Sequence, residues 1–113
     1  MEVSFASNKL QKICSNAKKM RGELGGRCAE ELEECLFELK AAETLADMRS
    51  LPHARCHELS GDRKGQFAVD LEHPKRLIFE PDHTPRPTKP DGGLDWQQVT
   101  KVVVLEIVDY HGK

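Results

Sequence analysis

The chain has 113 residues and a net charge of −2, with 32% charged and 38% hydrophobic residues. This length and balance indicate one folded domain spanning residues 1–113 and exclude global disorder. Both signs of charge are spread evenly along the chain, which excludes the basic tail typical of strong, non-specific nucleic-acid binders.

The N-terminal part of the sequence predicts a short strand and a helical hairpin. Residues 2–6 alternate between apolar and polar side chains, as in a strand, and Ser7 is a typical helix N-cap. Helical spacing of apolar residues then predicts one amphipathic helix to about Met20, followed by a glycine-rich break. A second helix is expected over residues 27–42, with an apolar stripe of Cys28, Leu32, Cys35, Leu36 and Leu39.

The middle of the chain predicts antiparallel strands. Thr44 and Asp47 are expected to cap one further helical turn before Pro52. Strands are then expected at residues 55–60, 67–71 and 77–79, separated by tight turns.

A proline-rich loop insertion is expected over residues 81–99, with Trp96 anchoring one helical turn near its end. The apolar and β-branched residues of 101–108 predict a last strand buried on both faces. The expected fold is therefore α+β, with the helical hairpin packed on a mainly antiparallel sheet of four to five strands.

Several polar residues at the expected strand ends are of the types that cleave RNA without a metal. Histidine serves as acid or base near neutral pH, which makes His57 and His111 candidates. Arginine binds phosphate oxygens in a bidentate manner. Taken singly, each of these residues is more simply explained as a surface side chain, and only the combination points to a site.

The combination resembles a known family. The run His57-x-Leu59-x-Gly61-Asp62-Arg63-x-Gly65, the segment beginning at Arg76 and the ending Asp109-Tyr110-His111 are similar to the HigB-like (killer protein) branch of the RelE/ParE toxin superfamily.

The resemblance implies a toxin of a type II toxin–antitoxin system: a ribosome-dependent mRNA endoribonuclease, or mRNA interferase. It implies no cofactor and no metal. The matching positions imply these catalytic residues: His57, Asp109, Tyr110 and His111. They imply these RNA- or phosphate-binding residues: Arg63, Lys64 and Arg76.

The resemblance also implies partners and a location. The expected partners are a cognate antitoxin of the helix-turn-helix, HigA-like kind, and the ribosome with its mRNA. Operator DNA would be contacted only through the antitoxin. The absence of a signal peptide or a membrane-spanning apolar run predicts a cytoplasmic protein with reduced cysteines and no membrane partner.

Non-catalytic functions are the main alternatives. A ParE-like relative would inhibit DNA gyrase without catalysis and would not need the histidine pair, and an inactive relative would only bind its antitoxin.

A zinc site is an alternative with these candidate ligands: His53, Cys56, His57, His73 and His83. Pro52 and the following strand pattern argue against the helix that such a site would need. A cysteine hydrolase built on Cys56 is disfavoured because Cys56 and His57 would point to opposite strand faces.

Overall fold

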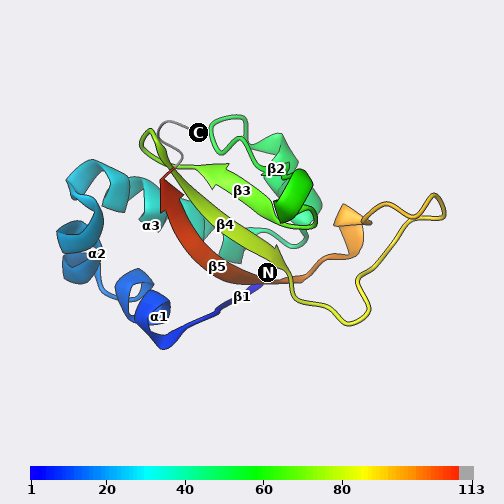
Figure 1. Ribbon diagram of the computed structural model, residues 1–113, viewed down its shortest axis with the longest axis horizontal. Coiled ribbons are helices and arrows are strands. Elements are labelled where there is room, and N and C mark those ends of the chain that lie inside the picture. The colour runs from blue at the N-terminus through cyan, green and yellow to red at the C-terminus, as the bar shows by residue number, and fades with distance from the viewer. Residues whose placement is uncertain (110–113) are drawn as a thin grey trace.

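The computed structural model describes residues 1–109 as three helices, three 3₁₀ turns and five strands (Figure 1). The helices are α1 Asn8–Cys14, α2 Ala17–Leu24 and α3 Gly26–Ala41, and the 3₁₀ turns are η1 Leu45–Ser50, η2 Gly61–Arg63 and η3 Trp96–Gln98. The strands are β1 Glu2–Phe5, β2 His57–Glu58, β3 Phe67–Asp70, β4 Lys75–Pro81 and β5 Lys101–Asp109.

The strands form one sheet in the order β1-β5-β4-β3-β2. Strand β1 is parallel to β5, and the other neighbours are antiparallel. In Figure 1 α3 lies behind the sheet, so one face is covered by helix and the other faces the viewer. The predicted α+β fold is confirmed, with the refinement that the sheet is mixed. We call the face opposite α3 the outer face.

The first predicted helix is in fact two helices, so this part of the prediction is wrong. Ser7 caps α1 as expected, since its Oγ accepts a hydrogen bond from the amide of Leu10 at 3.1 Å. The chain then breaks at Asn16, whose Oδ1 accepts from the amides of Lys18 and Lys19 at 3.0 and 3.1 Å. An asparagine side chain that bonds the next two free amides starts a new helix instead of continuing the old one.

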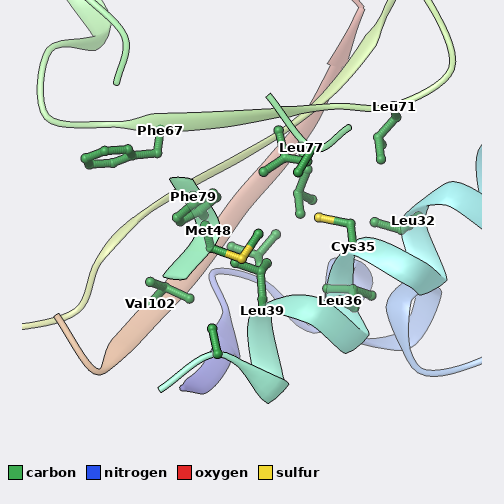
Figure 2. Close-up of a cluster of buried hydrophobic side chains, with 14 of the residues drawn as sticks. Leu32, Cys35, Leu36, Leu39, Met48, Phe67, Leu71, Leu77, Phe79 and Val102 are labelled. Carbon is green, nitrogen blue, oxygen red and sulfur yellow. The ribbon is translucent and has the colours of Figure 1, made fainter. Parts of the chain in front are cut away.

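The hydrophobic core lies between α3 and the sheet (Figure 2). Every residue of the predicted α3 stripe is buried: Cys28, Leu32, Cys35, Leu36 and Leu39. They pack against the helix-side residues of the central strands, of which Phe67, Leu77 and Phe79 are fully buried. The ring of Phe67 stacks on Phe79 with 5.8 Å between centroids. The 3.6-residue period of α3 therefore predicts the core face correctly.

Strand β5 is not buried on both faces as the sequence predicts. Val102 and Val104 are fully buried, but Lys101 and Glu106 are exposed. The register against β4 also shifts, because Phe79 pairs with Val104 whereas its neighbour Ile78 pairs with Glu106. The extra residue between the two pairs, Leu105, marks a β-bulge.

The segment between the helices and β3 is less regular than predicted. Only His57–Glu58 of the expected strand 55–60 pairs with β3. The expected helical turn after Thr44 is present as η1. Among the described residues, no helix is both long and apolar enough to cross a membrane.

Trp96 anchors the end of the long loop, as predicted. Its indole is buried and lies edge-on to Phe67, with 4.8 Å between ring centroids. The guanidinium carbon of Arg49 lies 3.7 Å from the centre of the Trp96 ring. The rest of the loop extends away from the sheet at the end opposite α2 (Figure 1).

Candidate functional site

His57 lies on the outer face of the sheet. It pairs with Ala68 of β3, whose neighbours Phe67 and Val69 belong to the helix-side core, so strand alternation directs Ala68 and His57 outward. His57 Nδ1 is 2.7 Å from the carbonyl oxygen of Arg55. Because a carbonyl only accepts, Nδ1 carries the hydrogen, and the lone pair of the neutral ring is on Nε2. This is the tautomer that a histidine base needs at Nε2.

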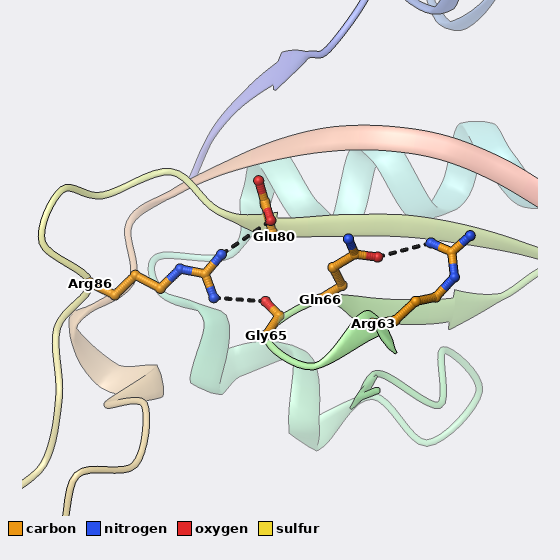
Figure 3. Close-up of polar contacts among 5 residues, drawn as sticks. All are labelled: Arg63, Gly65, Gln66, Glu80 and Arg86. Carbon is orange, nitrogen blue, oxygen red and sulfur yellow. Dashed lines mark hydrogen bonds and ion pairs between the residues drawn. The ribbon is translucent and has the colours of Figure 1, made fainter. Parts of the chain in front are cut away.

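Arg63 extends over the outer face from the β2–β3 connection. Its Nη1 donates to Gln66 Oε1 at 2.9 Å (Figure 3), and its Nη2 lies 2.9 Å from Glu106 Oε2 on β5. Arg63 thus links η2 to β5, on the same face of the sheet. Its neighbour Lys64 is exposed. The connection shields the middle of the outer face, where Ile78 is fully buried although it lies outside the helix-side core.

Arg76 is on the same face as His57, because its strand partner is Asp70. Arg76 Nε lies 3.0 Å from Asp70 Oδ1, and Arg55 Nε lies 3.1 Å from Asp70 Oδ2. Asp70 therefore stands between two guanidinium groups. Strand geometry separates His57 and Arg76 by two strand spacings of about 4.8 Å each and by one pleat repeat of about 7 Å along the strand. A ligand that touches both must extend across the outer face.

Asp109, the last described residue, is placed on the opposite face. It pairs with Lys75, which alternates with Arg76 along β4. Asp109 and Lys75 line a cavity of about 360 Å³ together with Leu10 and Ile13 of α1. The structure therefore brings His57, Arg63 and Arg76 to one face, whereas strand alternation directs Asp109 to the other.

Tyr110 and His111, which the sequence also nominates, lie outside the described residues. Their roles, like that of Asp109, stay predictions.

Arg86 was missed by the sequence analysis. It belongs to the proline-rich loop, and its guanidinium reaches back to the outer face (Figure 3). Its Nη1 donates to the carbonyl oxygen of Gly65 at 2.8 Å, and its Nη2 to Glu80 Oε1 at 3.1 Å. The only local signal is an arginine between two prolines, Pro85 and Pro87, which does not indicate where the side chain binds.

On the outer face, three carboxylates of the described residues pair with four guanidinium groups, because Arg55 and Arg76 share Asp70. Arg63 contacts Glu106, Arg76 contacts Asp70, and Arg86 contacts Glu80. These side chains are between 25% and 47% exposed, so water and a ligand can reach them. An arginine fork that holds a carboxylate can also hold a phosphate. The pairing holds the guanidinium groups in fixed orientations but offsets their positive charge. The outer face is therefore not strongly basic, in agreement with the net charge of −2.

A separate group of potential metal ligands lies where α3 meets the segment before β2. Within residues 1–109, the donor atoms of Glu34, Glu38 and His53 lie within 4.8 Å of one another. A short hydrogen bond of 2.6 Å joins His53 Nε2 to Glu38 Oε2, and it raises the pKa of His53 above its ordinary value. Of the five zinc candidates in the sequence, this group contains only His53.

Comparison with known proteins supports the fold. No protein-family model matches the chain, and no curated protein matches it. Among solved structures it is similar to a YoeB/ParE toxin from Agrobacterium tumefaciens, with a TM-score of 0.55 and 9% sequence identity. The alignment covers 98% of this chain and all of the other. This chain has the fold of that toxin. The identity is too low to carry the toxin's activity or its residues across.

Proposed function

We propose that this protein is the toxin of a toxin–antitoxin pair and cleaves RNA at the outer face of its sheet. The observation that supports the proposal is the placement of His57, Arg63 and Arg76 on one face. The sequence motif that nominates these residues is independent of the fold similarity. The HigB-like branch, the HigA-like antitoxin and the dependence on a ribosome are parts of the proposal that rest on the motif.

The chemistry needs only side chains. His57 Nε2, unprotonated when the ring is neutral, takes the proton of a ribose 2′-hydroxyl. The 2′-oxygen attacks the adjacent phosphorus, and the bond from phosphorus to the 5′-oxygen of the next nucleotide breaks. Arg76 and Arg63 stabilise the charge that develops on the phosphate oxygens. The leaving 5′-oxygen takes a proton from an acid, a role for which the motif nominates His111, and the products are a 2′,3′-cyclic phosphate and a 5′-hydroxyl.

The experiment is cleavage of an end-labelled messenger RNA by the purified protein, with and without ribosomes. The native protein should give discrete fragments with cyclic phosphate ends. His57→Ala and Arg76→Ala should each lower the rate by about 10²-fold, a typical cost of removing one acid–base or charge-stabilising group. A matched control is Arg27→Ala, because Arg27 lies in α3 and is 76% exposed in its contacts with Glu31 and Glu72.

The competing function is non-catalytic inhibition of DNA gyrase. The observation that favours it is that Arg63, Arg76 and Arg86 each contact a carboxylate, which reduces their attraction for RNA. Inhibition of gyrase supercoiling without cleavage of RNA in the presence of ribosomes would favour that function. Binding to an antitoxin with neither activity would indicate an inactive relative.

A further inference from the structure

The side chains of Glu34, Glu38 and His53 meet where α3 packs against the segment that follows η1. Glu34 and Glu38 are one helical turn apart, so their carboxylates lie side by side on α3. His53 approaches from a different part of the chain, 15 residues beyond Glu38. Two elements thus supply three donors of two chemical kinds, a carboxylate pair and an imidazole.

The spacing of the donors suits a metal ion. Three atoms that are no more than 4.8 Å apart leave a central point about 2.8 Å or less from each, and Zn²⁺ bonds to nitrogen and carboxylate oxygen are about 2.0–2.2 Å. Small rotations of the exposed ends of Glu34 and His53 would bring the three donors to bonding distance and leave a fourth position for water. The hydrogen bond places His53 Nε2 and Glu38 Oε2 side by side, and a bound ion would take the place of the proton between them.

The surroundings favour a cation and leave room for a water ligand. A cavity of about 190 Å³ is lined by all three side chains. Its lining also includes the carboxylate of Glu31, that of Asp70, which is paired with Arg55 and Arg76, and the apolar residues Val69 and Leu71. The Glu38 side chain is 16% exposed, whereas that of His53 is 55% exposed, so an ion can enter from solvent while one carboxylate lies in a partly desolvated wall.

We propose that Glu34, Glu38 and His53 bind one divalent transition-metal ion, for which Zn²⁺ is the best match. An imidazole with two carboxylates and an open position for water is a ligand set for Zn²⁺ rather than for Mg²⁺, which prefers oxygen ligands alone. The site cross-links α3 to the segment that leads into β2. None of its three ligands belongs to the set His57, Arg63 and Arg76, and the proposal does not rest on the proposed function.

Metal binding at this site stabilises a stretch of chain with little regular structure. Between η1 and β2 that stretch is held by the amide of Asp70, which donates to the carbonyl oxygen of Ala54 at 3.1 Å, and by the ion pair of Arg55 with Asp70. A bound ion would fix His53, the residue immediately before Ala54. Metal binding is therefore expected to raise the stability of the folded protein.

The test uses untagged, full-length protein that has been freed of metal with a chelator. Titration with Zn²⁺ in a calorimeter, and with Co²⁺ followed by its visible absorption, should show one ion bound per chain. His53→Gln and Glu38→Gln should each weaken binding by at least about tenfold, since the loss of even a supporting residue commonly costs that much. The Co²⁺ spectrum should lose intensity in the same variants.

Two matched variants control for surface effects. His73→Gln removes another exposed imidazole, and Glu33→Gln removes a carboxylate from α3 that faces a different cavity. Both should bind as the native protein does. Absence of saturable binding to the native protein, or equal weakening in all four variants, would overturn the proposal.

A second measurement separates binding from folding. Circular dichroism establishes that each variant is folded before titration. Zn²⁺ should raise the thermal midpoint of the native protein and of Glu33→Gln, but not that of His53→Gln. An equal rise in folded His53→Gln would contradict the site.

Discussion

Arg63 and Glu106 are joined across the outer face of the sheet, with 2.9 Å between Nη2 and Oε2. Arg63 comes from the β2–β3 connection and Glu106 from β5, so the contact spans β3 and β4. Arg63 also donates to Gln66, which holds the guanidinium in a fixed orientation. Glu106 therefore positions one of the candidate phosphate-binding groups and at the same time offsets its charge.

We predict that Glu106→Gln strengthens RNA binding. The substitution releases Arg63 from an ion pair whose carboxylate is 47% exposed, so the gain should be roughly threefold and should fall as salt is raised. Binding to a short RNA by fluorescence anisotropy measures it. Glu33→Gln makes the same change of net charge on α3. If both variants strengthen RNA binding by the same factor, the change in net charge is responsible and the Arg63–Glu106 contact is not.

We predict that Phe67→Ala lowers the free energy of unfolding by about 3–5 kcal/mol, as is typical when a buried aromatic ring is removed. Phe67 is fully buried and contacts both Phe79 and Trp96. Urea denaturation measures the change. The matched control is Phe37→Ala on α3, where the side chain is 72% exposed and the change should stay within about 0.5 kcal/mol. Similar losses of stability in the two variants would contradict the burial of Phe67 in the core.

How much of this architecture is visible in the sequence depends on the range of the interaction. The buried stripe of α3 follows from local periodicity, and Trp96 is the only tryptophan of the sequence, so both are predictable. The break at Asn16 is not, because a polar residue on a helix surface and a helix cap look alike. The bulge at Leu105 has no local signal, since Leu105 simply ends the apolar run of residues 102–105. A shift in strand register depends on the partner strand, which the segment itself does not encode.

The candidate site shows the same division. The motif brings His57, Arg63 and Arg76 to attention, and strand alternation explains why His57 and Arg76 share a face. The contacts of Arg86 with Gly65 and Glu80 cannot be predicted locally, because they join a long loop to two other elements. Asp109 is adjacent in sequence to other candidates, but alternation along β5 directs it to the helix side.

We predict that the cysteine thiols are unreactive in the folded protein. Burial raises the pKa of Cys14 to about 11 and that of Cys56 to about 12, whereas burial of Cys35 raises its pKa further. A rise of two units lowers the thiolate fraction at pH 8 by about a hundredfold. Reaction with a disulfide reagent at pH 8 should therefore be slow in buffer and fast in urea. Equally fast reaction of all four thiols in buffer would contradict this prediction.

The same shifts give a pH dependence of stability. The folded pKa values of Cys14 and Cys56 lie above the unfolded value near 9, so the folded state binds more protons than the unfolded state at alkaline pH. This contribution to stability is complete below about pH 9 and is lost as the pH rises through the folded values. The urea midpoint should fall above pH 9, and it should fall less in Cys56→Ala. An equal fall in that variant would assign the effect to other groups.

We predict that Gly65→Ala destabilises the protein and disturbs the contact of the long loop with the outer face. Gly65 has a φ of +90°, and a Cβ added there would lie 2.8 Å from Arg86 Nη1. The backbone strain costs about 1–3 kcal/mol, and the new methyl group also displaces the guanidinium from the carbonyl oxygen of Gly65. Urea denaturation measures the stability. Limited proteolysis within residues 87–93 measures how firmly the loop is held, and Arg86→Ala should increase that cleavage as well.

Gly22→Ala is the matched control for Gly65→Ala. Gly22 lies within α2, and a Cβ there would meet nothing within 4 Å, so alanine should stabilise the helix by about 0.5–1 kcal/mol. The two glycine substitutions should therefore have opposite signs. In the double variant Gly65→Ala/Arg86→Ala the steric part of the cost is relieved, and the combined loss should be smaller than the sum of the single losses. Strict additivity would show that Arg86 does not contact Gly65 in solution.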